Sequence, residues 1–362
     1  MTKLFNMGNF IKKNIYSLFT IFKILIFNIV IFISTIILLE LFLGDWFNNP
    51  LKNKLSSERN INRIYSFKFS NYEGHSHYKR DNFAFRSDQE TVLDKVDVVF
   101  TGGSTTNQKF LKTEDTFVSL LDKKNKKTLI VNAGIDGMSI RGHIKSFQYW
   151  FNKMPKLKPK YFIFYIGIND QQLFTSLNTI NDYKAANPID SLKESNALAD
   201  LREYLESNSF FYNSLREIKA KIFLNFSKEI GANKVNSKTI VYGKRSSSNF
   251  TPYNANKFKK LKIPNSEYLE LLNTLTKEVS NFGSKPIYIT QISGNGMNER
   301  LYLISETIMH HCKKKDLVCI NLAKKINLDY SDFYDGYHLN PNGSKKVFTY
   351  LDKELRNKKI LY

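Results

Sequence analysis

Apolar residues fall into five short runs along this chain, and longer stretches with helical spacing separate the runs. The five runs are Val96–Thr101, Thr128–Asn132, Tyr161–Ile166, Pro286–Gln291 and Leu317–Asn321. Continuous apolar strands that alternate with helices are typical of a parallel sheet covered on both faces. We therefore predict an α/β fold, a three-layer α/β/α domain around a five-stranded parallel sheet, over residues 94–362.

The interval between the third and fourth predicted strands, residues 171–280, is too long for a simple crossover. Its sequence predicts helical pieces near Ser191–Asn225 and Glu267–Asn281, on either side of a Lys-, Ser- and Asn-rich loop from Ser227 to Lys260. We expect this insertion to be either a lid that shapes a binding site or a structural excursion without such a role.

A second hydrophobic pattern lies near the N-terminus, where Ile24–Leu43 is almost uninterrupted and has about the 20 residues that cross a bilayer as a helix. We predict a short tail at 1–23 and a transmembrane helix at 24–44. A cleaved signal peptide is the main alternative, although no small-residue cleavage site follows, and a buried core helix is another. The flanking positive charges are nearly balanced, with Lys3, Lys12, Lys13 and Lys23 before the span and Lys52, Lys54, Arg59 and Arg63 after it.

Residues 45–93 are polar and rich in Asn and Lys, so we expect a lead-in segment from the membrane to the domain, with local structure near 83–86. His75 and His77 are interpreted as solvated loop residues. A folded domain that follows one N-terminal span is the usual arrangement of a protein outside the cytoplasm, and we expect that side for the domain.

The composition is that of a globular protein, with 362 residues of which 42% are hydrophobic. The formal net charge is +21, but the lysines are scattered and interleaved with acids, which indicates a basic solvated surface. No stripe of basic and aromatic residues or other nucleic-acid motif accompanies the charge, so we expect no nucleic-acid partner.

Two cysteines, Cys312 and Cys319, are too few for a disulfide framework or a thiolate zinc site. Their positions in a predicted helix end and a predicted strand favour two small core residues, and a bond between them is the alternative. The neighbouring His310 and His311 lack a second spaced pair of ligands, so we expect no metal and no cofactor.

Candidate chemistry begins with Ser104, which directly follows the first predicted strand of the sheet. A serine hydroxyl becomes a good nucleophile when a histidine takes its proton and a carboxylate fixes the tautomer of that histidine. Asp335 and His338 supply this pair, because their spacing lets one turn present both side chains on the same side. Each motif alone has a simpler interpretation, a phosphate-binding or tight turn at Ser104 and a surface turn at Asp335.

Attack on an ester creates an oxyanion, which needs hydrogen-bond donors already in place. We expect an oxyanion hole from the backbone N–H of Ser104, the N–H of Gly137 and the side-chain amide of Asn169. Asn169 and Asp170 could instead cap a helix, and the nearby Gly134 and Gly137 could serve the backbone turn alone. Three further residues, Arg141, His143 and Asp136, either line the mouth of the site or are solvated.

Taken in order, these four segments resemble the blocks of the SGNH or GDSL hydrolase family. The matches are at Ser104 for the nucleophile, Gly137 for the glycine block, Gly167, Asn169 and Asp170 for the third block, and Asp335 and His338 for the last. The resemblance covers about residues 96–350. It implies the flavodoxin-like α/β/α fold of that family, metal-independent ester hydrolysis and the catalytic roles of those residues.

One departure is visible in the first block, where Gly103 stands in place of the Asp of the family name and Thr105 in place of its Leu. This variant is similar to carbohydrate esterases more than to lipase-like members. We expect a membrane-anchored serine esterase that removes acyl groups, in particular acetyl, from a carbohydrate or another envelope ester. An O-acyltransferase with the same triad, a lipid esterase and a catalytically silent glycan-binding module are the alternatives.

Overall fold

The structure is a computed structural model of the whole chain. It describes residues 2–44, 46, 59–176, 179–180, 205, 209–212, 214–215, 234–235, 240–241, 250–258, 260–261 and 263–362.

A five-stranded parallel sheet forms the centre of the domain, with the spatial order β11-β10-β5-β3-β4. The strands are β3 (Val96–Gly102), β4 (Leu129–Asn132), β5 (Tyr161–Ile166), β10 (Lys285–Thr290) and β11 (Val318–Ile320). The five predicted strands are thus confirmed to within a few residues at each end. The order reverses direction at β3, and in open α/β sheets ligands bind beside the carboxyl ends of the strands at such a switch point.

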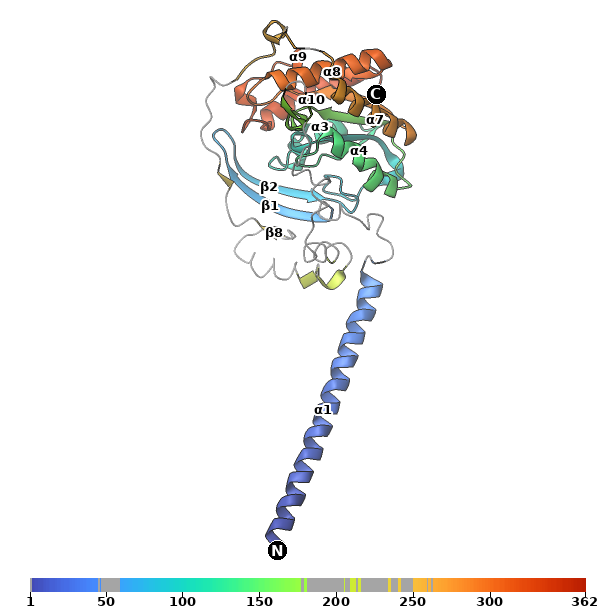
Figure 1. The fold of residues 1–362 in the computed structure, drawn as a ribbon, viewed down its shortest axis with the longest axis vertical. Helices are drawn as coiled ribbons and strands as arrows, with labels where there is room; N and C mark the ends of the chain where they lie inside the picture. The colour runs from blue at the N-terminus through green and yellow to red at the C-terminus, as the bar shows by residue number, and fades with distance from the viewer. Residues whose placement is uncertain are drawn as a thin grey trace.

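Helices cover both faces of the sheet, as Figure 1 shows, so the predicted three-layer α/β/α fold is confirmed. Neighbouring strand residues point to opposite faces: Val99 and Phe162 pack in one hydrophobic cluster, Val98 and Ile163 in the other. The first cluster lies against α4 (Ile140–Tyr149), α7 (Ser266–Asn281) and most of α8 (Glu299–Lys315), and the second against α3 (Phe117–Lys124), α9 (Leu322–Lys325) and α10 (Pro341–Asn357).

Smaller elements complete the described part of the chain. They are α2 (Ser104–Asn107), β6 (Phe174–Ser176), β7 (Thr179–Ile180), β8 (Lys234–Val235), β9 (Ile240–Val241) and the 3-10 helices η2 (Leu93–Lys95), η3 (Thr113–Asp115), η4 (Phe151–Lys153), η5 (Asn169–Leu173), η8 (Ala255–Phe258) and η9 (Tyr330–Asp332). Of the insertion, the helix predicted near 267–281 is present as α7. Most of the helical piece predicted at 191–225, and most of the loop at 227–260, lie outside the described residues.

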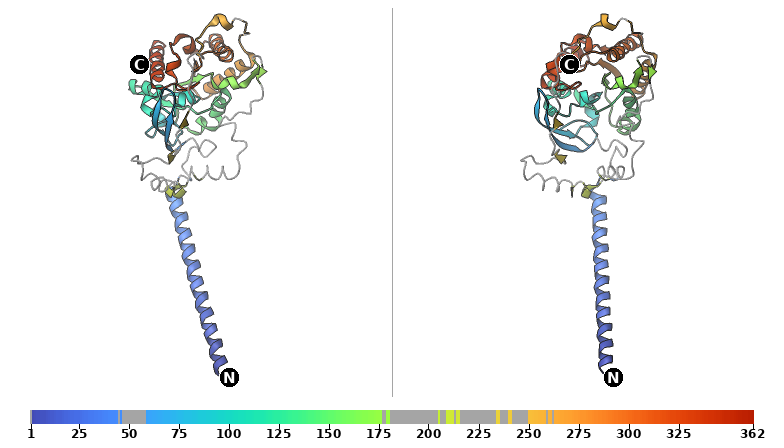
Figure 2. Two further views of the ribbon diagram at one scale, coloured as in Figure 1. Left: turned by 90° about the vertical axis from the view of Figure 1, so that its left-hand side faces the viewer. Right: turned by 60° about the vertical axis from the view of Figure 1, so that its left-hand side comes forward.

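The lead-in segment is more ordered than the sequence indicates. Strands β1 (Ile61–Lys68) and β2 (Glu73–Arg80) form an antiparallel hairpin, which lies against the body of the domain in Figure 2. Arg80, at the end of β2, is buried and donates to the carbonyl of Gly134 at 2.7 Å. The hairpin is therefore attached to the sheet domain by buried polar contacts as well as by apolar ones.

The two histidines of the lead-in lie in a strand, which corrects the prediction of a loop, although His75 is exposed to solvent as expected. His75 and His77 both lie on β2. Nδ1 of His75 lies 2.9 Å from Oγ of Ser66, and Nε2 of His77 lies 2.6 Å from Oδ1 of Asn62. Both contacts reach across to β1, so these histidines belong to the hairpin.

Helix α1 (Thr2–Leu43) extends away from the domain (Figure 1). Its part from Phe19 to Leu43, 25 residues with a mean hydropathy of 2.7, is long and apolar enough to cross a membrane. Because none of this stretch is buried against other described residues, α1 is not a core helix. Its length and composition suit a membrane span or a signal sequence.

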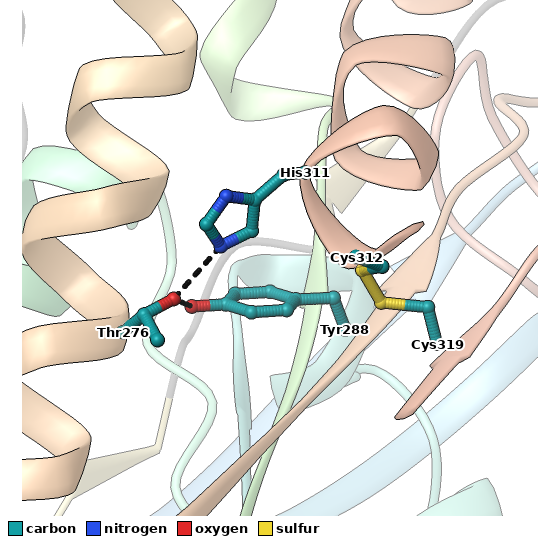
Figure 3. Close-up of a disulfide and its surroundings, with 5 residues drawn as sticks. All are labelled: Thr276, Tyr288, His311, Cys312 and Cys319. Carbon is teal, nitrogen blue, oxygen red and sulfur yellow. Dashed lines mark hydrogen bonds between the residues drawn. A yellow bond between two sulfur atoms is a disulfide. The ribbon is translucent and has the colours of Figure 1, made fainter. Parts of the chain in front are cut away.

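The two cysteines form a disulfide, which corrects the expectation of two separate core thiols (Figure 3). Asp316, in a left-handed conformation with φ of 52°, ends α8 and turns the chain back into β11, so that the Cα atoms of Cys312 and Cys319 lie 6.1 Å apart. Beside the bridge, His311 is buried and its Nε2 lies 2.9 Å from Oγ1 of Thr276. Burial lowers the pKa of His311 to about 4, so this imidazole is neutral at physiological pH.

Candidate active site

Ser104 occupies the sharp turn between β3 and α2, at the carboxyl edge of the sheet. The backbone before it must come very close to other groups: a Cβ on Gly103 would lie 2.0 Å from Nδ2 of Asn169. Glycine at position 103 therefore lets the Asn169 amide lie directly beside the turn that carries Ser104, and a larger residue there would require this amide to shift.

The side chains of Ser104, His338 and Asp335 form one hydrogen-bonded chain. Nε2 of His338 lies 2.7 Å from Oγ of Ser104, although the two residues are 234 positions apart. On the other side of the ring, Nδ1 lies 2.7 Å from Oδ2 of Asp335 and 2.9 Å from its Oδ1. Asp335 fixes the ring with a proton on Nδ1, which leaves Nε2 free to accept from the hydroxyl.

The loop that carries Asp335 and His338 is also held by its own backbone. Oδ1 of Asp335 accepts from the N–H groups of Tyr337 and His338, both at 2.8 Å. Burial raises the pKa of Asp335. The hydrogen bond and charge of His338, together with the two N–H groups, outweigh this effect and hold the pKa of Asp335 below its usual value. The carboxylate is therefore ionised at neutral pH.

The three expected oxyanion donors lie around the same turn. Asn169 begins η5 after β5, and its Nδ2 donates to the carbonyl of Met138 at 2.9 Å while it faces Gly103. Gly137 has φ of 77°, the left-handed conformation that favours glycine. Among the described residues, the N–H groups of Ser104 and Gly137 have no hydrogen-bond acceptor. Two backbone donors are thus available to a ligand at this edge of the sheet.

Asp170, the neighbour of Asn169, is buried and serves the scaffold. Its carboxylate accepts from the N–H of Ile140, at the start of α4, and from the hydroxyl of Tyr268 on α7, both at 2.7 Å. It therefore caps α4, a helix earlier in the chain, and not the helix that follows it in sequence. Burial raises the pKa of Asp170 to about 6.

Asp136, one of the three additional residues, lies near the site, because the charge of His338 acts on its carboxylate. It bonds to Nδ2 of Asn107 at 2.8 Å and to Nζ of Lys109 at 2.5 Å. Burial raises the pKa of Asp136. The charge and hydrogen bond of Lys109 outweigh burial and keep the pKa of Asp136 below its usual value, and the charge of His338 also lowers it. Sequence analysis did not single out Lys109, because its partner is 27 positions away and no local pattern links the two.

His143 neither lines the mouth nor is solvated, which corrects both interpretations. It is fully buried, and its Nδ1 lies 3.2 Å from Oγ1 of Thr101 in β3. Burial lowers the pKa of His143 to about 3, so the ring is a neutral core residue. Arg141, on the same helix α4, is partly exposed.

Gln291 is a buried residue that sequence analysis missed. Its Nε2 donates to Oγ1 of Thr105 at 2.8 Å and to the carbonyl of Tyr165 at 3.0 Å, and its Oε1 accepts from the N–H of Ile168 at 2.7 Å. These bonds connect the residue after Ser104 with the residues on either side of Gly167. No motif marks a glutamine at a strand end, so only the three-dimensional contacts reveal this role.

No family model matches the chain, and no curated protein matches it in sequence. Similar solved structures include a G-D-S-L lipolytic protein, a lipase/acylhydrolase and an esterase. A lipolytic protein of the G-D-S-L family from Desulfitobacterium hafniense is 12% identical with a TM-score of 0.41, and covers 72% of this chain and 99% of its own. A lipase/acylhydrolase from Enterococcus faecalis is 13% identical with a TM-score of 0.40, and covers 73% and 96%.

A third similar structure is the esterase EstA from Pseudoalteromonas, 10% identical with a TM-score of 0.38, which covers 73% of this chain and 98% of its own. Of these three proteins, the one from Desulfitobacterium hafniense carries the G-D-S-L family name. The likeness concerns the course of the backbone, and the chemistry of this chain is inferred from its own side chains.

Proposed function

We propose that this protein is a membrane-anchored serine ester hydrolase that removes acetyl or similar acyl groups from a carbohydrate or another envelope ester. The hydrogen-bonded chain Ser104–His338–Asp335 is the observation that carries the proposal. A hydroxyl, an imidazole and an ionised carboxylate in this order are the parts that acyl transfer requires. The side chain of His338 is 22% exposed, so a substrate can reach it from solvent.

In the proposed reaction, Nε2 of His338 removes the proton of Ser104 while Oγ attacks the acyl carbon of the ester. The C–O bond to the alcohol then breaks, and the alcohol leaves with the proton held on Nε2. The acyl group stays on Oγ until a water molecule, deprotonated by the same nitrogen, releases it as the acid. Throughout, Asp335 stabilises the charged imidazole and keeps its orientation.

The carbonyl oxygen becomes negatively charged in each half of this reaction. The N–H groups of Ser104 and Gly137 and the amide of Asn169 are the proposed donors to it. Two observations support this assignment. Among the described residues, neither N–H group has a hydrogen-bond acceptor, and the amide of Asn169 lies beside the turn that carries Ser104.

The proposed location is outside the cytoplasm, with α1 as the anchor. The disulfide between Cys312 and Cys319 supports this side, because disulfides persist in oxidising compartments and are rare in the cytosol. A domain on that side, tethered by one helix, meets the esters of the cell envelope. The choice of a carbohydrate ester rests on the resemblance of the nucleophile block to carbohydrate esterases.

The test is the mass of the intact protein after brief exposure to an activated acetate ester. We expect one acetyl adduct on Ser104 and turnover of the ester, with both absent in Ser104→Ala and turnover nearly abolished in His338→Ala. Rates in both variants equal to the parent protein would refute the proposal. Acetate released to water, as opposed to acetyl moved to an added sugar, separates a hydrolase from an acyltransferase.

A further inference from the structure

The loop that carries Asp335 and His338 is contacted from outside by the turn of the N-terminal hairpin, residues 69–72. Nδ2 of Asn71 donates to the carbonyl of Phe333 at 2.9 Å and to that of Ser331 at 3.4 Å. Ser331 and Phe333 are 260 and 262 positions away from Asn71 in the chain. The hairpin turn therefore holds the backbone just before the catalytic pair.

A column of aromatic rings connects the hairpin turn to the imidazole itself. The ring of Phe69 stacks on that of Tyr334, with centroids 4.3 Å apart and planes at 21°. The ring of Tyr334 also lies parallel to that of His338, with centroids 5.5 Å apart and planes at 13°. Phe69 and Tyr334 are 5% and 2% exposed, so neither ring has room to move.

The same hairpin also contacts the segment that follows the nucleophile. The hydroxyl of Tyr72 donates to the carbonyl of Phe110 at 3.1 Å, and Oγ of Ser76 lies 2.7 Å from the carbonyls of Lys109 and Leu111. The ring of Phe110 packs edge-on against Phe69. The hairpin thus bonds both to the chain after Ser104 and to the chain before His338.

We propose that the hairpin turn is a positioning element of the active site, in which Asn71 and the rings of Phe69 and Tyr334 set the distance between Ser104 and His338. The inference rests on the proposed function. A displacement of about 1 Å between reacting groups lowers a rate on the order of a hundredfold, so the contacts need not touch substrate to matter. Under this proposal the hairpin at residues 61–80, which follows the proposed anchor, positions the catalytic residues in addition to connecting the helix to the domain.

The test compares Asn71→Asp with Asn62→Asp in the full chain. Asn71→Asp keeps the shape of the side chain, removes both N–H donors and sets a charge against two carbonyls. Asn62 lies in the same hairpin, and among the described residues its side chain accepts one hydrogen bond, from His77, which an aspartate also accepts, so it is the matched control. We expect kcat on an activated acetate ester to fall 10- to 100-fold in Asn71→Asp with KM within twofold, and Asn62→Asp to match the parent.

A second pair of variants tests the ring column. Tyr334→Phe keeps a ring against His338, and we expect it to stay within about threefold of the parent kcat, whereas Tyr334→Leu loses the stack and we expect a loss of tenfold or more. A purely structural role would lower the melting temperature in step with activity in all variants. The positioning role lowers kcat in Asn71→Asp at a melting temperature close to that of Asn62→Asp.

Amide hydrogen exchange gives a readout that does not depend on catalysis. The N–H groups of Tyr337 and His338 are bonded to Asp335, and we expect their exchange to accelerate in Asn71→Asp but not in Asn62→Asp. A parent protein without esterase activity would refute the proposed function, while exchange would still report on the loop. Equal exchange and equal kcat in the two aspartate variants would overturn the positioning role.

Discussion

At the scale of single residues, the site combines positions that a sequence pattern can indicate with positions that it cannot. Asp335 and His338 are predictable because both lie in one turn, where three positions of spacing bring two side chains together. Gln291 and Lys109 act through partners distant in sequence, and their residue types are ordinary for a strand end and a surface loop. Their contribution follows from tertiary contacts alone.

Asn169 is the residue whose proposed role has the most specific energetic signature. If its amide donates to the oxyanion, Asn169→Ala loses stabilisation that exists only in the transition state, on the order of 3 kcal/mol. We expect kcat to fall about a hundredfold with little change in KM. Steady-state kinetics on an activated acetate ester measures both quantities, and a rise in KM at constant kcat would instead assign Asn169 to ground-state binding.

Asp170 makes a distinct prediction about stability and pH. Its folded pKa, about 6, lies above the usual value of 3.8, so between these values the folded state holds the proton more firmly than the unfolded state. The stability that this group contributes is therefore full at acidic pH and declines as the pH rises through 6. In Asp170→Asn this decline is absent, and relative to the parent protein the variant gains about 2 kcal/mol between pH 4 and pH 7.5.

Urea unfolding of the parent and of Asp170→Asn at the two pH values tests this expectation. The asparagine keeps an oxygen for the N–H of Ile140, so the cap of α4 remains. A constant difference between the two proteins at both pH values would show that Asp170 does not change its protonation in this range.

At the scale of elements, the central strands were predictable and the hairpin was not. β3 and β5 are continuous apolar runs because both faces of a parallel sheet are buried. β1 and β2 carry Asn, Arg, Ser and His among their few apolar residues, and some of these polar groups, such as Ser76 and Arg80, bond to partners distant in the chain. Their composition is that of a linker, and only their tertiary contacts, polar and apolar, distinguish them from one.

The link between α8 and β11 is testable at the same scale. The two cysteines are separated by seven positions, a short loop, so the double variant Cys312→Ala/Cys319→Ala should lower the free energy of unfolding by about 2 kcal/mol. Denaturant unfolding with and without a reducing agent measures the effect. We expect the reductant to destabilise the parent and to leave the double variant unchanged; a parent that ignores the reductant would argue against a bridge in the purified protein.

At the scale of the whole molecule, the chain joins an exposed apolar helix to a globular α/β domain with the reactive residues at one edge of its sheet. The scattered positive charge gives the domain a basic surface without a defined stripe, and the disulfide suits the outer side of a membrane. Sequence alone predicted the helix and the sheet, because each is marked by continuous apolar runs, about 20 residues long in the helix and much shorter in the strands. It could not decide the orientation, since the charges on both sides of the helix are almost equal.

The hydroxyl of Ser104 and the imidazole of His338 meet across 234 positions, and α10 begins at Pro341, three residues after the histidine. During synthesis a ribosome delivers the serine long before its base, so a partly made chain has no acid–base partner for the hydroxyl. The pair is therefore incomplete until translation has passed position 338, and a stop codon anywhere before that position leaves a product in which Ser104 lacks this histidine.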